Sequence, residues 1–215
     1  MPKSPVKFES DSRDSIPTIG VLISGRGSNL QAVIDAINDR RLAARIGVVV
    51  SNRADAPGLS RAAAANIETL VMPHKDAPSR EAYDRSLVDV LTRRGVSLVC
   101  LAGFMRLLGP VFCDAFPQAI LNVHPSLLPA FRGVDAQQQA LDAGATVSGA
   151  TVHFVTPDLD AGPIVLQSAV PVVTGEPREA LAARILEQEH RLLPEAIRLV
   201  IAGRVRVARG LAVLR

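Results

Sequence analysis

A polar pair, Asn122 and His124, follows an apolar run within the stretch NVHPSLLPAFRG. One position separates the two residues, so their side chains share a face if the strand continues through them. The Asn122 amide offers neutral N–H donors that can stabilise an oxyanion. The His124 imidazole can give or take a proton near neutral pH. Pro125 and Pro129 restrict the backbone that follows, which favours a preorganised pair. A single histidine is more often structural, so both interpretations stay open on these residues alone.

Two carboxylates, Asp158 and Asp160, lie further along the chain in HFVTPDLDAGPIV. Aspartate is common in turns, so turn formation alone can account for both. Alternatively, one of them approaches His124, where its negative charge would favour the imidazolium form. Spacing along the chain does not decide between these two interpretations.

The stretch ISGRGSNLQ contains two glycines, Gly25 and Gly27, that allow a tight turn with close backbone approach. Ser28 and Asn29 then open a predicted helix, whose free N–H groups favour an anion. Leu30 stands where a dinucleotide fingerprint has its third glycine, and no Gly-Lys-Ser/Thr follows as in a P-loop. The stretch therefore predicts either a monophosphate site or a plain strand-to-helix turn with a serine cap.

A third cluster, LAGFMRLLGP, follows another apolar run, with Gly103 at the predicted end of the strand. The short apolar stretch from Met105 to Leu108 can line a pocket for a flat aromatic ligand. A buried loop explains the same residues equally well.

Apolar runs and helical periodicity alternate along the chain and predict the scaffold for these clusters. Buried strands are expected over 18–24, 45–51, 68–72, 96–102 and 119–123, and helices over 28–40, 58–67 and 79–95. The last helix begins at a Ser N-cap and ends at a glycine. This alternation predicts an α/β, Rossmann-like fold, a mostly parallel twisted sheet with helices on both faces. Ligands bind such sheets beyond the carboxyl ends of the strands, where the polar clusters fall.

The pattern changes in the C-terminal part. Strands over 148–155 and 163–172 are too close in sequence for a helical crossover, so they predict an antiparallel hairpin. A long helix over 176–202 follows, and RVRV and LAVL predict a small terminal ribbon. With no repeat or linker, we expect a single domain over 18–215, preceded by a flexible polar extension over 1–17.

The composition narrows the classes of function. The 215 residues are 48% hydrophobic and 21% charged, which is typical of a folded protein, and the net charge is only +3. No dense basic run with interleaved aromatic residues indicates nucleic-acid binding, and no apolar stretch approaches the roughly 20 residues of a membrane span. The two cysteines favour a reducing, cytoplasmic location. No His/Cys/carboxylate cluster indicates a metal.

Taken together, these motifs resemble the folate-dependent formyltransferase family. The resemblance rests on ISGRGSNLQA, SNRADAPGL, SREAYDR, LAGFMRLL, LNVHPSLLP, TVHFVTPDLDAGPI and EQEH, which appear in family order and cover about 18–205. HPSLLP with a later LDAGPI is specific to the wider family, and SGRGSNLQA is similar to its glycinamide ribonucleotide branch.

The resemblance implies a function in purine (IMP) biosynthesis: transfer of a formyl group from 10-formyltetrahydrofolate, the co-substrate, to the amine of 5'-phosphoribosylglycinamide. It implies the catalytic residues Asn122, His124 and Asp160. It assigns the phosphoribosyl group to Gly27, Ser28, Asn29, Leu30 and Glu189. It assigns the folate to Arg80, Met105, Arg106, Leu107, Leu108, Asn122, Thr156, Asp158 and Asp160.

In the implied reaction, Asn122 and protonated His124 stabilise the oxyanion of a tetrahedral intermediate, and His124 assists proton transfer to the departing folate nitrogen. Asp160 orients His124 and keeps it cationic. Small-molecule substrates are the expected partners, without nucleic acid, membrane or metal, and both a monomer and a homodimer stay open. Residues 131–137 and Pro157 depart from the pattern of better-known members.

The alternatives are a formyltetrahydrofolate hydrolase or another formyltransferase of the same fold. From other classes, a nucleotide-binding oxidoreductase would need a third glycine at Leu30 and an acidic residue after the second strand, where the chain has Ser51 and Asn52. A non-catalytic phosphate-binding module would leave Asn122, His124 and Asp160 without a role.

Overall fold

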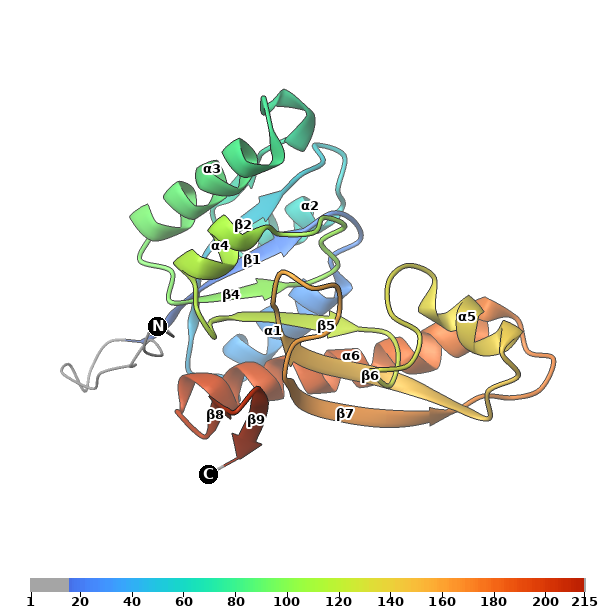
Figure 1. Ribbon diagram of the computed structural model, residues 1–215. Coiled ribbons are helices and arrows are strands. Elements are labelled where there is room, and N and C mark those ends of the chain that lie inside the picture. Colours follow the sequence, from blue (N-terminus) through green and yellow to red (C-terminus); the bar gives the residue numbers. More distant parts are fainter. Residues whose placement is uncertain (1–15, 215) are drawn as a thin grey trace. The chain divides into compact units, whose positions relative to one another are not determined.

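The computed structural model describes residues 16–214, so nearly all of the predicted extension over 1–17 lies outside the described residues. The chain forms two compact units, one running to Leu121 and one beginning at Asn122. Figure 1 shows the elements of both, and each unit is described by itself.

The first unit is built on four parallel strands in the order β3-β2-β1-β4. Their bounds are β1 (Thr18–Ile23), β2 (Arg45–Ser51), β3 (Thr69–Val71) and β4 (Leu98–Leu101). Every residue of β1 and β4 is buried, as expected for aliphatic strands covered on both sides. The parallel arrangement is the one that the sequence predicts.

The helices of the first unit contact each other in two pairs, α1 with α2 and α3 with α4. Their bounds are α1 (Ser28–Asn38), α2 (Gly58–Ala64), α3 (Arg80–Arg93) and α4 (Pro110–Ala115), with a 3₁₀ turn, η1 (His74–Asp76), before α3. Ser79 caps α3 by accepting a hydrogen bond from the Ala82 N–H at 3.1 Å, as predicted. Figure 1 shows the α3–α4 pair on one side of these strands.

The second unit opens inside a strand, because β5 (Ile120–His124) contains the boundary between the units. The strands β6 (Val147–Phe154) and β7 (Ile164–Pro171) pair antiparallel, and β8 (Val205–Ala208) pairs antiparallel with β9 (Leu211–Leu214). The predicted hairpin and terminal ribbon are therefore confirmed.

Two helices complete the second unit. The long helix α6 (Arg178–Ile201) contacts β6 and β7, and α5 (Ala136–Asp142) contacts α6 and β6. A small aliphatic core joins these elements; it consists of Ala140, Ala150, Val170, Leu181 and Ile185. Burial of these side chains holds α5 against β6 and α6.

The strands β1 to β7 form a mixed, mostly parallel sheet, which confirms the predicted α/β class. The single domain expected over 18–215 stays a prediction. Within residues 16–214, no helix is long and apolar enough to span a bilayer.

Candidate active site

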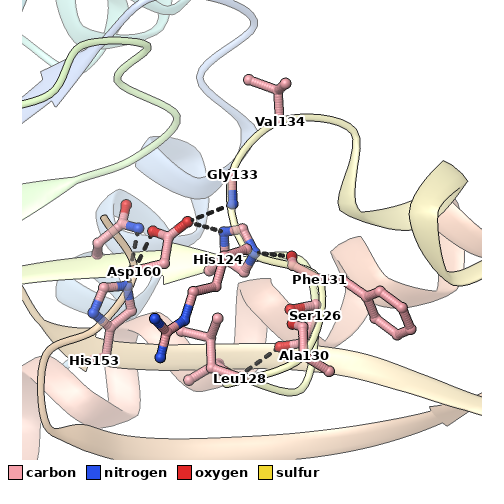
Figure 2. Close-up of polar contacts among 12 residues, drawn as sticks. His124, Ser126, Leu128, Ala130, Phe131, Gly133, Val134, His153 and Asp160 are labelled. Atoms are coloured by element: carbon pink, nitrogen blue, oxygen red, sulfur yellow. Dashed lines mark hydrogen bonds and ion pairs between the residues drawn. The ribbon is translucent and has the colours of Figure 1, made fainter. Parts of the chain in front are cut away.

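His124 is the last residue of β5, and its side chain lies between two oxygen atoms (Figure 2). Its Nε2 is 2.8 Å from the carbonyl oxygen of Phe131, and its Nδ1 is 3.4 Å from Oδ2 of Asp160. A carbonyl oxygen and a carboxylate only accept hydrogen bonds, so both contacts need a proton on the ring nitrogen. Both nitrogens of this buried ring therefore face acceptor oxygens.

The same oxygen of Asp160 has a second partner. Its Oδ2 also accepts a hydrogen bond from the Gly133 N–H at 2.8 Å, and its side chain is largely buried. The structure thus brings Asp160, and not Asp158, to His124. Asp158 is exposed, and its carbonyl oxygen is 3.4 Å from the Thr156 hydroxyl.

Asn122 contacts a second histidine, His153 of β6. Nδ2 of Asn122 is 3.2 Å from Nε2 of His153, and Nδ1 of His153 is 2.9 Å from the Phe154 carbonyl oxygen. Because that carbonyl needs a proton on Nδ1, Nε2 is left to accept from the Asn122 amide. The amide is thereby oriented, and Nδ2 carries a second N–H.

Burial lowers the pKa of His153, although the Phe154 carbonyl and Asp160 act in the opposite direction. Nε2 of His153 is also 3.7 Å from Oδ1 of Asp160, a distance that counts as an ion pair only for a protonated ring. A lowered pKa and a donating Asn122 amide both indicate a neutral ring, so this contact is no salt bridge at neutral pH. His153 and Asn122 are 31 residues apart, and sequence reasoning missed their contact.

The glycine-rich turn of the first unit packs against the start of α2. Gly27 is the N-cap of α1 with φ of 70°, and a Cβ there would lie 2.6 Å from Cα of Gly58. The Gly58 N–H donates to the carbonyl of Gly25 at 3.0 Å. No side chain caps α1 and Ser28 is its first helical residue, so the serine cap of the second interpretation is not formed. The N-terminus of a helix suits an anion.

The segment after β4 is tied to the end of β1. The Met105 N–H donates to Oγ of Ser24 at 2.8 Å, and this hydroxyl donates to Oδ1 of Asn52 at 2.6 Å. The side chains of Met105 and Leu107 are exposed, whereas Leu108 is buried. The stretch from Met105 to Leu108 is therefore neither wholly buried nor wholly exposed.

Two arginines of the first unit lie near one buried carboxylate. Asp84 accepts a hydrogen bond from the Gly109 N–H at 2.7 Å, and burial raises the pKa of Asp84. The charges of Arg80 and Arg106 act in the opposite direction, so both guanidinium groups are close enough to influence it. A positive pair of this kind can bind a carboxylate of a ligand.

The remaining predicted site residues divide between the units. Asn29 and Leu30 are buried in the first turn of α1, and Glu189 is buried on α6 of the second unit. Across the part of the chain that the structure describes, no group of three or more His, Cys, Asp or Glu residues could hold a metal ion.

Comparison with known proteins shows which family the chain belongs to. The formyl transferase family model matches residues 18–197. Phosphoribosylglycinamide formyltransferase of Escherichia coli (strain K12) is 44% identical over 189 residues, covering 88% of this chain and 89% of the relative. The crystal structure of glycinamide ribonucleotide transformylase 1 from Symbiobacterium toebii is 52% identical with a TM-score of 0.91, covering 93% of this chain and 94% of that one.

Longer relatives match as well. The trifunctional purine biosynthetic protein adenosine-3 of Bos taurus is 48% identical over 88% of this chain. This chain spans only 19% of that protein, so it corresponds to one part of it.

Proposed function

The chain belongs to the formyl transferase family, and we propose that it transfers the formyl group of 10-formyltetrahydrofolate to the amine of 5'-phosphoribosylglycinamide. The products are formylglycinamide ribonucleotide and tetrahydrofolate, an early step of purine biosynthesis. The contact of His124 with Asp160 is the observation that supports the proposal most directly. His124 lies on the same strand as Asn122.

The proposed chemistry begins when the amine attacks the formyl carbon and a negative oxygen develops in a tetrahedral intermediate. Asn122 supplies an N–H, and the imidazolium of His124 supplies positive charge. The 3.4 Å between Nδ1 of His124 and Asp160 is longer than the roughly 2.7–2.9 Å of a tight charged hydrogen bond. Asp160 therefore leaves this N–H able to share its hydrogen bond with the oxyanion, while Nε2 keeps its contact with the Phe131 carbonyl oxygen.

Collapse of the intermediate breaks the bond between the formyl carbon and the folate nitrogen, which takes up a proton, while the attacking nitrogen gives up one, so no net proton is consumed. His124 assists this transfer, because it holds a proton that an imidazolium can give up near neutral pH. Asp160 keeps the ring oriented and favours its cationic form.

The motif assignments supply the residues for each substrate. For the phosphoribosyl group they are Gly27, Ser28, Asn29, Leu30 and Glu189, and the uncapped first turn of α1 supports an anion there. For the folate they are Arg80, the segment from Met105 to Leu108, Thr156 and Asp158, and the Arg80–Arg106 pair suits a folate carboxylate. The protein would act in the cytoplasm on small molecules, without nucleic acid, membrane or metal, as a monomer or a homodimer.

The experiment is a formyl-transfer assay with the purified protein, 10-formyltetrahydrofolate and 5'-phosphoribosylglycinamide, run beside His124→Ala. We expect wild type to release tetrahydrofolate only when the ribonucleotide is present. Loss of acid–base catalysis by one histidine costs about 100-fold or more, so the variant should fall at least that far.

A hydrolase of the same fold is the competing function, because water can replace the amine as the acceptor of the formyl group. It would release formate from 10-formyltetrahydrofolate without any ribonucleotide, which would overturn the proposal. No turnover under either condition would overturn it as well.

A further inference from the structure

One peptide plane in the loop before α5, between Arg132 and Gly133, is hydrogen-bonded on both of its sides. Nε2 of Gln139, on α5, is 3.0 Å from the Arg132 carbonyl oxygen and 2.8 Å from the Val134 carbonyl oxygen. On the opposite side, the N–H of Gly133 donates to Asp160. A single side-chain amide thus holds the two carbonyls that flank Gly133.

The C=O and N–H of a trans peptide point in opposite directions. A shift of the Gln139 amide can therefore move this peptide plane and, with it, the N–H that donates to Asp160. A hydrogen bond accepted by the C=O polarises the peptide and strengthens the bond that its N–H donates. The contacts form one chain, from Gln139 through the 132–133 peptide and Asp160 to His124.

The same loop also contacts His124 directly. The carbonyl of Phe131, one peptide earlier, accepts from Nε2 of the ring at 2.8 Å (Figure 2). Both oxygens that His124 contacts therefore depend on where residues 131–133 lie. The backbone of this loop decides the environment of the proposed catalytic residue.

The backbone of this loop is strained, although the Phe131 side chain packs against the small aliphatic core of the unit. Phe131 and Asp135 have φ of 55° and 54°, values that non-glycine residues rarely adopt. Val134 is 79% exposed, so burial of its side chain does not fix the loop. The ion pair between Arg178 and Asp135 is exposed and stabilises little.

We propose that Gln139 is a positioning residue for the formyl transfer, acting through the 132–133 peptide on Asp160 and His124. The inference rests on the proposed function, because it assumes that His124 takes part in the reaction. Removing both N–H donors of Gln139 should let the loop move and weaken both acceptors that His124 contacts.

The test compares Gln139→Leu with Gln138→Leu in the full chain. Gln138 is the matched control: it is the neighbouring glutamine on α5, and its amide donates to Asp142 at the surface. In formyl transfer we expect Gln139→Leu to lower kcat about tenfold or more, because small displacements of catalytic groups are costly. The KM values for both substrates should change less than about twofold, since only catalytic positioning is lost.

A second readout does not depend on activity. The amide hydrogen of Gly133, followed by NMR hydrogen exchange, should exchange about tenfold faster in Gln139→Leu, because its peptide loses the partner on its carbonyl side. Exchange at the β1 amides, in the other unit, should be unchanged if the variant is folded.

Equal kcat in the two variants, or an unchanged Gly133 exchange rate, would overturn the proposal. A fall in melting temperature with kcat intact would also overturn it, because Gln139 would then only stabilise the fold. If wild type transfers no formyl group, the proposed function fails, whereas the exchange comparison still tests the contact of Gln139 with the loop.

Discussion

At the scale of single residues, two neighbouring histidines have different hydrogen-bond partners. His124 has oxygen acceptors at both ring nitrogens, whereas His153 has an acceptor at Nδ1 and a donor, Asn122, at Nε2. Both rings contact Asp160. The two rings share this carboxylate and differ in their other partner.

The neutral state of His153 predicts a pH dependence of stability. Its pKa is lowered in the folded protein, so below the ordinary value of 6.5 the unfolded chain binds a proton that the folded chain does not. Stability contributed by the neutral ring is present above this value and is lost as the pH falls toward the lowered folded value. The loss is at most about 1.4 kcal/mol per pH unit for one proton.

Urea unfolding of wild type and His153→Gln between pH 7 and pH 5 checks this. The free energy of unfolding should fall more steeply with decreasing pH in wild type, because the variant lacks the titrating ring. Distant groups titrate alike in both proteins and cancel, whereas Asp160 and His124 are coupled to His153 and contribute to the difference. Parallel curves would show that His153 titrates alike in the folded and unfolded states.

At the scale of elements, the turn from β1 into α1 depends on one glycine. Alanine at Gly27 would have φ of 70° and a Cβ 2.6 Å from Cα of Gly58, so backbone must move. We expect Gly27→Ala to lower the free energy of unfolding by about 2 kcal/mol, given the roughly 1–3 kcal/mol of such strain. It should also raise KM for the ribonucleotide about tenfold, since the first turn of α1 shifts.

The matched control for this prediction is Gly25→Ala. A Cβ on Gly25 meets nothing within 4 Å, so this variant should keep both its stability and its KM for the ribonucleotide. Thermal unfolding and steady-state kinetics measure the two quantities. If both alanine variants behave alike, the close approach of Gly27 to α2 is irrelevant to substrate binding.

Elements with long periodic or apolar patterns could be predicted from the sequence. The strand over 45–51 is predicted at its observed bounds, and the helix that Ser79 caps and the C-terminal hairpin are also as predicted. The helices α4 and α5 were missed, because six or seven residues beside prolines or consecutive glutamines carry little periodicity.

Prediction of the site from the sequence is limited in a similar way. Sequence motifs selected Asn122, His124 and Asp160, because their types and their place after a strand indicate chemistry. The Gly133 N–H on Asp160 and the Phe131 carbonyl on His124 are main-chain contacts. Since every residue carries these backbone groups, residue types give no signal for them.

At the scale of the whole molecule, the expected single domain over 18–215 is a prediction about cooperativity. Separate compact units normally unfold independently when few contacts join them. Here the boundary falls inside β5, where Ile120 and Leu121 belong to the first unit and Asn122 to His124 belong to the second. Melting either unit would therefore remove part of a strand that the other unit uses.

Scanning calorimetry of the full chain should accordingly show one transition, with equal calorimetric and van't Hoff enthalpies. The buried strand residues on either side of the boundary, Leu121 and Val123, should exchange their amide hydrogens at similar, globally limited rates. Two resolved transitions, or fast exchange confined to one side of β5, would show two domains that fold independently. In that case the three proposed catalytic residues, which all lie beyond Leu121, would belong to a domain of their own.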